Sequence, residues 1–134
     1  LVYKCKGSRE MILITDAMRG AGLPEGSCTK LGSLEQGQEV IIEDGVAKMP
    51  DRTSFAGSIA SGDRLIRTMR DLTGVPLQEI VAMMTANPAK LLGLEERKGK
   101  LQPGMDSDLI MFDEEINIRA VWTGGKCIFQ EKLS

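Results

Sequence analysis

A single acid follows an apolar run near the start of the sequence, in the stretch MILITD that ends at Asp16. The run at residues 11–14 predicts a strand buried on both faces, which is typical of the parallel sheets of α/β proteins. At the carboxyl end of such a strand, where loops converge, a carboxylate could serve as general acid or base, or as a metal ligand. The alternative is structural: Asp16 braces the glycine-rich loop at residues 20–26 through hydrogen bonds to its backbone.

A second stretch with possible chemistry is FAGS, which contains Phe55, Ala56, Gly57 and Ser58. Its small, glycine-rich surroundings at residues 54–63 predict a loop in which Gly57 lets the backbone approach a ligand closely. The alternative is an ordinary connection that needs a positive φ at Gly57, and residue chemistry alone favours this alternative.

Composition limits the classes of function. With 17 basic and 19 acidic side chains the formal net charge is −2, so no strong positive field favours nucleic acid or an anionic membrane. No apolar run approaches the roughly 18 residues of a membrane span. The three cysteines, Cys5, Cys28 and Cys127, fit neither a disulfide framework nor a metal clip, so we expect a reducing, cytoplasmic compartment.

The elements that would position these residues are those of an α/β chain followed by antiparallel strands. Asp44-Gly45 between apolar arms predicts a β-hairpin near residues 38–50. Helices are expected at about residues 62–73, from Pro76 onward, and from an Asn87 N-cap with Pro88 in the first turn. Short strands are expected at residues 109–112, 116–122 and 126–130, the last two joined by the turn Gly124-Gly125.

Other charged residues are expected to be structural. The acids near the last strands straddle a strand and two turns, which favours solvated turn positions over a metal site; they are Asp106, Asp108, Asp113, Glu114 and Glu115. The mixed charges at residues 95–100 indicate an exposed surface segment. The chain has no histidine, so the most common general acid/base side chain of active sites is missing from it.

Five segments together resemble the C-terminal part of the N-acetylglucosamine-6-phosphate deacetylases, within the amidohydrolase superfamily. In order the segments are ITDAMRGAGLPEG, FAGS, TANPAKLLGL, RKGKLQPGMDSDLIMFD and VWTGGKCIF. NPAKLLGL and KGKLQPGMDSDLIMFD are shared across the superfamily. The more selective signals are TDAM followed by AGLPEG, and FAGS at the expected spacing after it. The resemblance covers about residues 2–129 and implies a metal-dependent hydrolase that converts N-acetylglucosamine 6-phosphate to glucosamine 6-phosphate and acetate.

The resemblance also implies roles and domains. Asp16 would be the catalytic acid/base at the end of the last barrel strand. A divalent metal would polarise the water and the acetamide carbonyl, and Asp16 would take a proton from the water and pass it to the departing amine. Phe55, Ala56 and Gly57 would contact the sugar phosphate, with Phe in place of the usual Leu. Residues 1–97 would be the last strand and helices of a (β/α)₈ barrel, and residues 98–134 strands of a small β-sandwich. A homodimer is implied as well.

The absence of histidine departs from the family, whose metal ligands include histidines on earlier strands. We therefore expect a fragment of a longer enzyme that binds no metal and is inactive alone. Two alternatives stay open: another amidohydrolase-superfamily enzyme with a different substrate, or a short, non-catalytic binding or assembly module.

Overall fold

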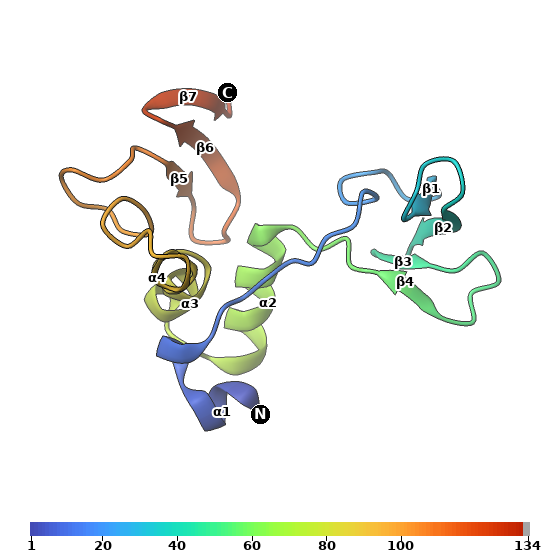
Figure 1. The fold of residues 1–134 in the computed structure, drawn as a ribbon, viewed down its shortest axis with the longest axis horizontal. Coiled ribbons are helices and arrows are strands. Elements are labelled where there is room, and N and C mark those ends of the chain that lie inside the picture. Colours follow the sequence, from blue (N-terminus) through green and yellow to red (C-terminus); the bar gives the residue numbers. More distant parts are fainter. Residues whose placement is uncertain (133–134) are drawn as a thin grey trace. The chain divides into compact units, whose positions relative to one another are not determined.

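The computed structural model describes residues 1–132 and divides into two compact units. One unit comprises residues 14–65; the other joins residues 1–13 to the chain from residue 66 onward. Each unit has its own antiparallel sheet, and most of the helices lie in the second (Figure 1). The expectation of a mixed α/β chain is confirmed. None of the helices in the described part of the chain has the length and apolar character needed to cross a bilayer.

The unit of residues 14–65 is built on a four-stranded sheet in the order β1-β2-β3-β4 (Figure 1). Its strands are β1 (Cys28–Leu31), β2 (Gln38–Glu43), β3 (Val46–Lys48) and β4 (Phe55–Gly57). The predicted hairpin is confirmed as β2 and β3, with Asp44 and Gly45 at φ 55° and 69°. Both central residues of a tight I′ turn need positive φ, which Asp-Gly supplies at little cost.

The core of this unit lies on one face of the sheet. Val40, Ile42 and Ala47 are at most 1% exposed, and Met18, Met49 and Ile59 pack against them with Ala56. Ala56 belongs to β4, where the sequence predicted a loop. That prediction was wrong because the small Ala56 side chain fits this core, while its neighbours pair with β3.

The other unit contains helices α1 (Val2–Lys6), η1 (Ser8–Glu10), α3 (Leu77–Met84) and α4 (Ala86–Leu91), and the greater part of α2 (Gly62–Thr73). Val75, Ile80 and Met83 form its buried cluster. The prediction of α2 is confirmed at both ends, and Gly74, at φ 67°, donates its N–H to the Arg70 carbonyl. A glycine with positive φ is the usual residue after a helix.

Residues 11–14 do not form the predicted buried strand. Met11 and Leu13 pack against the helical cluster, whereas Ile12 is 37% and Ile14 76% exposed. The Leu13 N–H donates to the Met83 carbonyl at 3.0 Å, and no strand among residues 1–132 pairs with this segment. A buried parallel strand needs strands paired along its edges and elements covering both faces; here Met83, near the end of α3, and the helical cluster meet only part of this segment.

Helix α4 begins earlier than predicted. Thr85, not Asn87, is its N-cap, and Asn87 lies inside the first turn. The Asn87 side-chain amide instead donates to the Ser8 carbonyl at 2.7 Å and to the Met11 carbonyl at 2.6 Å. This tertiary use of the amide outweighs its capping preference, and it fixes the chain before residue 12 to α4.

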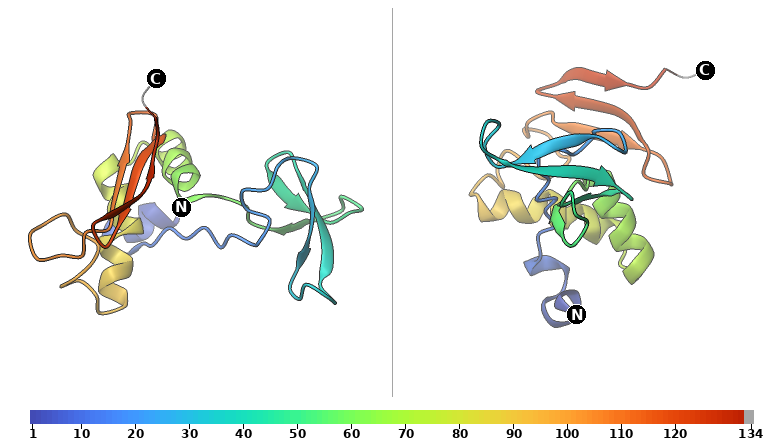
Figure 2. Two further views of the ribbon diagram at one scale, coloured as in Figure 1. Left: turned by 90° about the horizontal axis from the view of Figure 1, so that it is seen from above. Right: turned by 90° about the vertical axis from the view of Figure 1, so that its right-hand side faces the viewer.

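The C-terminal strands form a three-stranded meander, β5-β6-β7, drawn in orange to red in Figure 2. Strands β5 (Leu109–Phe112) and β7 (Lys126–Gln130) match the prediction, and β6 (Ile118–Thr123) begins two residues late. The delay has a cause at Ile116, which is fully buried with φ 64°, in a turn before the strand.

Asp113 organises that turn. Its Oδ1 accepts the backbone N–H groups of Glu115 and Asn117 at 3.0 and 2.8 Å, and Arg119 pairs with Oδ2. The N–H of Asn117 is the main cause that lowers the pKa of Asp113 from 3.8 to about 2. The turn is thus stabilised by the ionised carboxylate.

Replacing Asn87 should destabilise the chain. Asn87→Ala removes two hydrogen bonds from a half-buried amide and should lower the free energy of unfolding by about 1–3 kcal/mol. Urea denaturation followed by circular dichroism measures this. Gln78→Ala, on the exposed face of α3, is the control and should change stability by less than about 0.5 kcal/mol. Equal losses in both variants would contradict the role of Asn87.

Acid should weaken the Asp113 turn. Because folding lowers this pKa, the stabilisation is present above about pH 4 and is lost as the pH falls toward about 2. Asp113→Asn keeps an acceptor oxygen but no charge, so its unfolding free energy should vary less over that range than that of the wild type. Urea denaturation at several pH values tests this, and equal pH dependence in the two proteins would refute it.

Candidate functional site

Asp16 lies outside any helix or strand of the smaller unit, in the irregular segment of residues 15–18, here named the Asp16 turn. Its backbone has φ 46°, in the left-handed region, which Asp tolerates better than most side chains. The side chain is exposed, and none of the hydrogen bonds or ion pairs found within residues 1–132 involves its carboxylate. The carboxylate therefore does not brace the loop at residues 20–26 through hydrogen bonds.

The turn is joined to the residue that follows β4. Ala17 forms a parallel bridge with Ser58, and the Met18 N–H donates to the Ser58 carbonyl at 2.8 Å. The chain thus passes from Asp16 directly alongside FAGS, although about 40 residues separate the two stretches in sequence. The structure brings the two candidate segments together.

The three FAG residues play different parts in this arrangement. Phe55 is 76% exposed, Ala56 is buried in the core, and Gly57 is exposed with φ 133°. A side chain at Gly57 would be strained by that φ and would lie 3.4 Å from Met18 Cγ. Phe55 and Gly57 can therefore meet a ligand, whereas the Ala56 side chain supports the strand.

Three charged residues that the sequence did not single out bind backbone groups of turns in this unit. Glu25 Oε1 accepts the Gly45 N–H at 2.8 Å, and Arg64 donates to the Gly45 carbonyl at 2.8 Å. Arg19 donates to the Gly32 carbonyl at 2.7 Å. These charged side chains bind backbone groups in the loops between strands, and no local sequence motif predicts such contacts.

A divalent metal does not fit the side chains of this chain. The sequence has no histidine, and residues 1–132 contain no cluster of three or more Cys, Asp or Glu side chains that could hold a metal ion. Single carboxylates such as Asp16 do not make a closed donor set.

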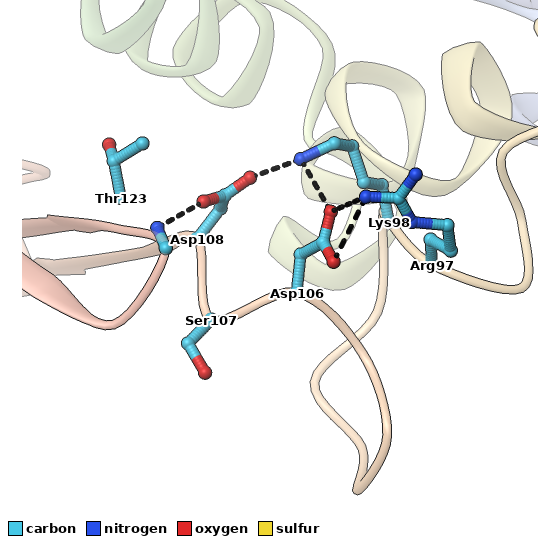
Figure 3. Close-up of a pocket in the computed structure, with 7 residues that line it drawn as sticks. Arg97, Lys98, Asp106, Ser107, Asp108 and Thr123 are labelled. Carbon is cyan, nitrogen blue, oxygen red and sulfur yellow. Dashed lines mark hydrogen bonds and ion pairs between the residues drawn. The ribbon is translucent and has the colours of Figure 1, made fainter.

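The acids near β5 face cations. Lys98 lies between Asp106 and Asp108, 3.0 Å from the former, and Arg97 is 3.1 Å from Asp106 (Figure 3). Hydrogen bonds from Lys98 lower the pKa of both carboxyl groups, and the bond to Asp108 raises the pKa of Lys98. The Gly124 N–H donates to Asp108 at 2.8 Å. These groups line an open depression of about 510 Å³.

The charged side chains of this depression pair with one another, and Asp108 also accepts a hydrogen bond from the β6–β7 turn. The Asp106 N–H also donates to the Arg97 carbonyl at 2.8 Å, so backbone and side chains tie residues 97–98 to the start of β5. The segment is structural, with exposed ion pairs that each contribute little stability.

Comparison with known proteins connects the chain to one family. Residues 8–132 match the amidohydrolase family. N-acetylglucosamine-6-phosphate deacetylase of Lysinibacillus sphaericus is 37% identical over 126 residues, which cover 94% of this chain and 31% of that protein. N-acetylgalactosamine-6-phosphate deacetylase of Escherichia coli O157:H7 is 34% identical over 122 residues, which cover 91% and 31%.

A solved structure agrees with this likeness. The crystal structure of N-acetylglucosamine-6-phosphate deacetylase from Thermotoga maritima superposes with a TM-score of 0.82 at 31% identity, over 97% of this chain and 34% of that one. The chain therefore spans about a third of the length of each of these three proteins.

Adding a side chain at Gly57 should disturb the contact between the two segments. Gly57→Ala should lower the free energy of unfolding by about 1–3 kcal/mol, because φ 133° is a region of glycine and Met18 must move. Gly32→Ala is the matched control, since Gly32 has φ 80° with no atom within 4 Å of the added carbon. Its loss should be about 1 kcal/mol. A loss no larger at Gly57 than at Gly32, measured by urea denaturation, would count against the close contact.

Proposed function

The chain belongs to the amidohydrolase family, and on this premise we propose that it is the C-terminal part of a deacetylase of N-acetylglucosamine 6-phosphate. The parent enzyme would release glucosamine 6-phosphate and acetate. The observation that carries the proposal is the bridge between Ala17 and Ser58, which sets an unpaired carboxylate beside FAGS. The relatives' names support the substrate class.

In this proposal Asp16 is the catalytic acid/base. Its carboxylate removes a proton from the water that attacks the acetamide carbonyl and then gives the proton to the departing amine. The Asp16 carboxylate is exposed and has no structural partner among the described residues, so it is accessible to a water and a substrate. The φ of 46° at Asp16 is a less common backbone conformation for a residue other than glycine, and such conformations cluster at functional sites.

Phe55, Ala56 and Gly57 form the substrate-contacting segment of the proposal. The exposed Phe55 ring offers an apolar face to the sugar, and the absence of a side chain at Gly57 leaves its backbone open. Ala56 would contribute through its backbone, since its side chain is buried in the core. Phe in place of Leu widens the apolar face that the sugar would meet.

The domain assignment is part of the proposal. Residues 1–97 would complete a (β/α)₈ barrel, with the hairpin near residues 38–50 as an insertion, and residues 98–134 would supply strands to a small β-sandwich. The parallel bridge at Ala17 and the antiparallel meander β5–β7 support these two assignments respectively. We also propose a homodimeric, cytoplasmic parent enzyme; the three free, exposed cysteines support a reducing compartment.

The divalent metal implied by the family would be held by residues outside this chain, because the donors present do not fit one. This chain alone is therefore proposed to be inactive.

A second substrate has a specific observation in its favour. The E. coli O157:H7 relative, named for N-acetylgalactosamine 6-phosphate, is 34% identical, close to the 37% of the L. sphaericus relative. The two sugars differ in the orientation of one hydroxyl group. Acetate release by the full-length enzyme from each sugar phosphate, and from N-acetylglucosamine without phosphate, distinguishes the candidates. We expect N-acetylglucosamine 6-phosphate to give the highest kcat/KM.

Replacing Asp16 tests the acid/base assignment. Asp16→Asn keeps a side chain that tolerates φ 46° and should leave folding and metal content unchanged. Without a proton acceptor, kcat of the full-length enzyme should fall by at least about 100-fold. Glu25 is a carboxylate of the following glycine-rich loop that binds a backbone N–H, so Glu25→Gln is the control and should retain kcat within about threefold. Activity retained in Asp16→Asn would overturn the assignment.

A further inference from the structure

Met18 contacts both segments of the proposed site. Its backbone N–H donates to the Ser58 carbonyl at 2.8 Å, two residues after Asp16. Its side chain also reaches Gly57, the last residue of β4. Met18 Cγ and Cβ lie 3.4 and 3.7 Å from the position that a Cβ atom at Gly57 would occupy. The same side chain packs on the cluster of Val40, Ile42 and Ala47.

The Met18 sulfur also fixes the chain that leaves the turn. Its Sδ accepts the Gly20 N–H at 3.0 Å. Gly20 is buried, and a side chain there would lie 2.8 Å from this sulfur and 2.7 Å from Ile42 Cδ1. Two glycines thus close around Met18, one on each of the segments that it joins.

The Asp16 side chain contributes nothing to this anchoring, because its carboxylate has no partner among the described residues. The backbone around it is held by the bridge of Ala17 with Ser58 and by the Met18 N–H, while the Ala17 N–H reaches Thr15 Oγ1 at 3.4 Å. The orientation of the turn therefore depends on how residues 17 and 18 are seated against Ser58, and the Met18 side chain packs at that point. A thioether suits this position because it is flexible enough to fill the space between the glycines and is a weak hydrogen-bond acceptor.

We infer that Met18 is a positioning residue that holds Asp16 in register with the segment Phe55–Gly57. In this inference Met18 acts through the turn to which Asp16 belongs and is not itself a catalytic residue. The inference rests on the proposed function for its effect on turnover, whereas its effect on the turn itself is independent of any activity. Misplacing a reacting group by about 1 Å can cost about 100-fold in rate.

Met49 provides a matched control. It is a half-buried methionine that packs on the same core cluster, and its backbone bonds go to Ser54 and Arg52 rather than to the Asp16 turn. Met18→Ala and Met49→Ala therefore remove the same atoms from one core, and only the first loosens the proposed site.

Steady-state kinetics of the full-length enzyme on N-acetylglucosamine 6-phosphate give the first readout. Met18→Ala should lower kcat by about 30–100-fold with KM within about threefold, and Met49→Ala should keep kcat within about threefold. Met18→Leu, which fills the space but offers no sulfur acceptor, should lie between them. Equal kcat in the two alanine variants, or a change in KM alone, would overturn the inference.

Amide hydrogen exchange of the same variants gives a readout that needs no turnover. In Met18→Ala the amides of residues 18 and 20 should lose protection while that of Ile42 keeps it, and Met49→Ala should leave all three unchanged. Unchanged exchange at residues 18 and 20 in Met18→Ala would overturn the inference. If the wild type releases no acetate, the proposed function fails, and the exchange result still decides whether Met18 holds the turn.

Discussion

The hydrogen bond from the Met18 N–H to the Ser58 carbonyl joins the two segments that give this chain its possible chemistry. The adjacent parallel bridge between Ala17 and Ser58 sets their register. Strand β4 must therefore lie against β3 with its other edge open to residue 17, and Gly57 must stay without a side chain where Met18 passes. A register error of one residue would turn every side chain of β4 to the opposite face.

In this unit the side chains that brace the loops are different from the one proposed to carry out the chemistry. Glu25 and Arg64 bind the Gly45 turn, and Met18 binds the loop backbone, so the bracing that Asp16 could have supplied is provided by others. The Asp16 carboxylate has a less common backbone conformation and no partner among residues 1–132, which supports the functional role proposed for it.

Local signals predicted what local chemistry controls. Asp44-Gly45 and Gly124-Gly125 mark their hairpin turns by residue type alone, and Gly74 marks the end of α2. The signals failed where a distant partner decides. Met11 and Leu13 pack against the helical cluster that includes α3, and β4 exists because Ala56 fits a core made by residues of β2 and β3. The closeness of residue 17 to Ser58 could be expected only from the family resemblance, since no local pattern encodes it.

Amide exchange at Met18 in the unmodified protein tests the central claim, that the Asp16 turn is anchored to the residue after β4. The hydrogen bond to Ser58 predicts that the Met18 amide exchanges within about tenfold of the rate of Ile42, whose N–H is bonded to the Ser27 carbonyl in the same unit. Exchange of Met18 at the rate of an unprotected amide would contradict the claim, because the two segments would then not be held together.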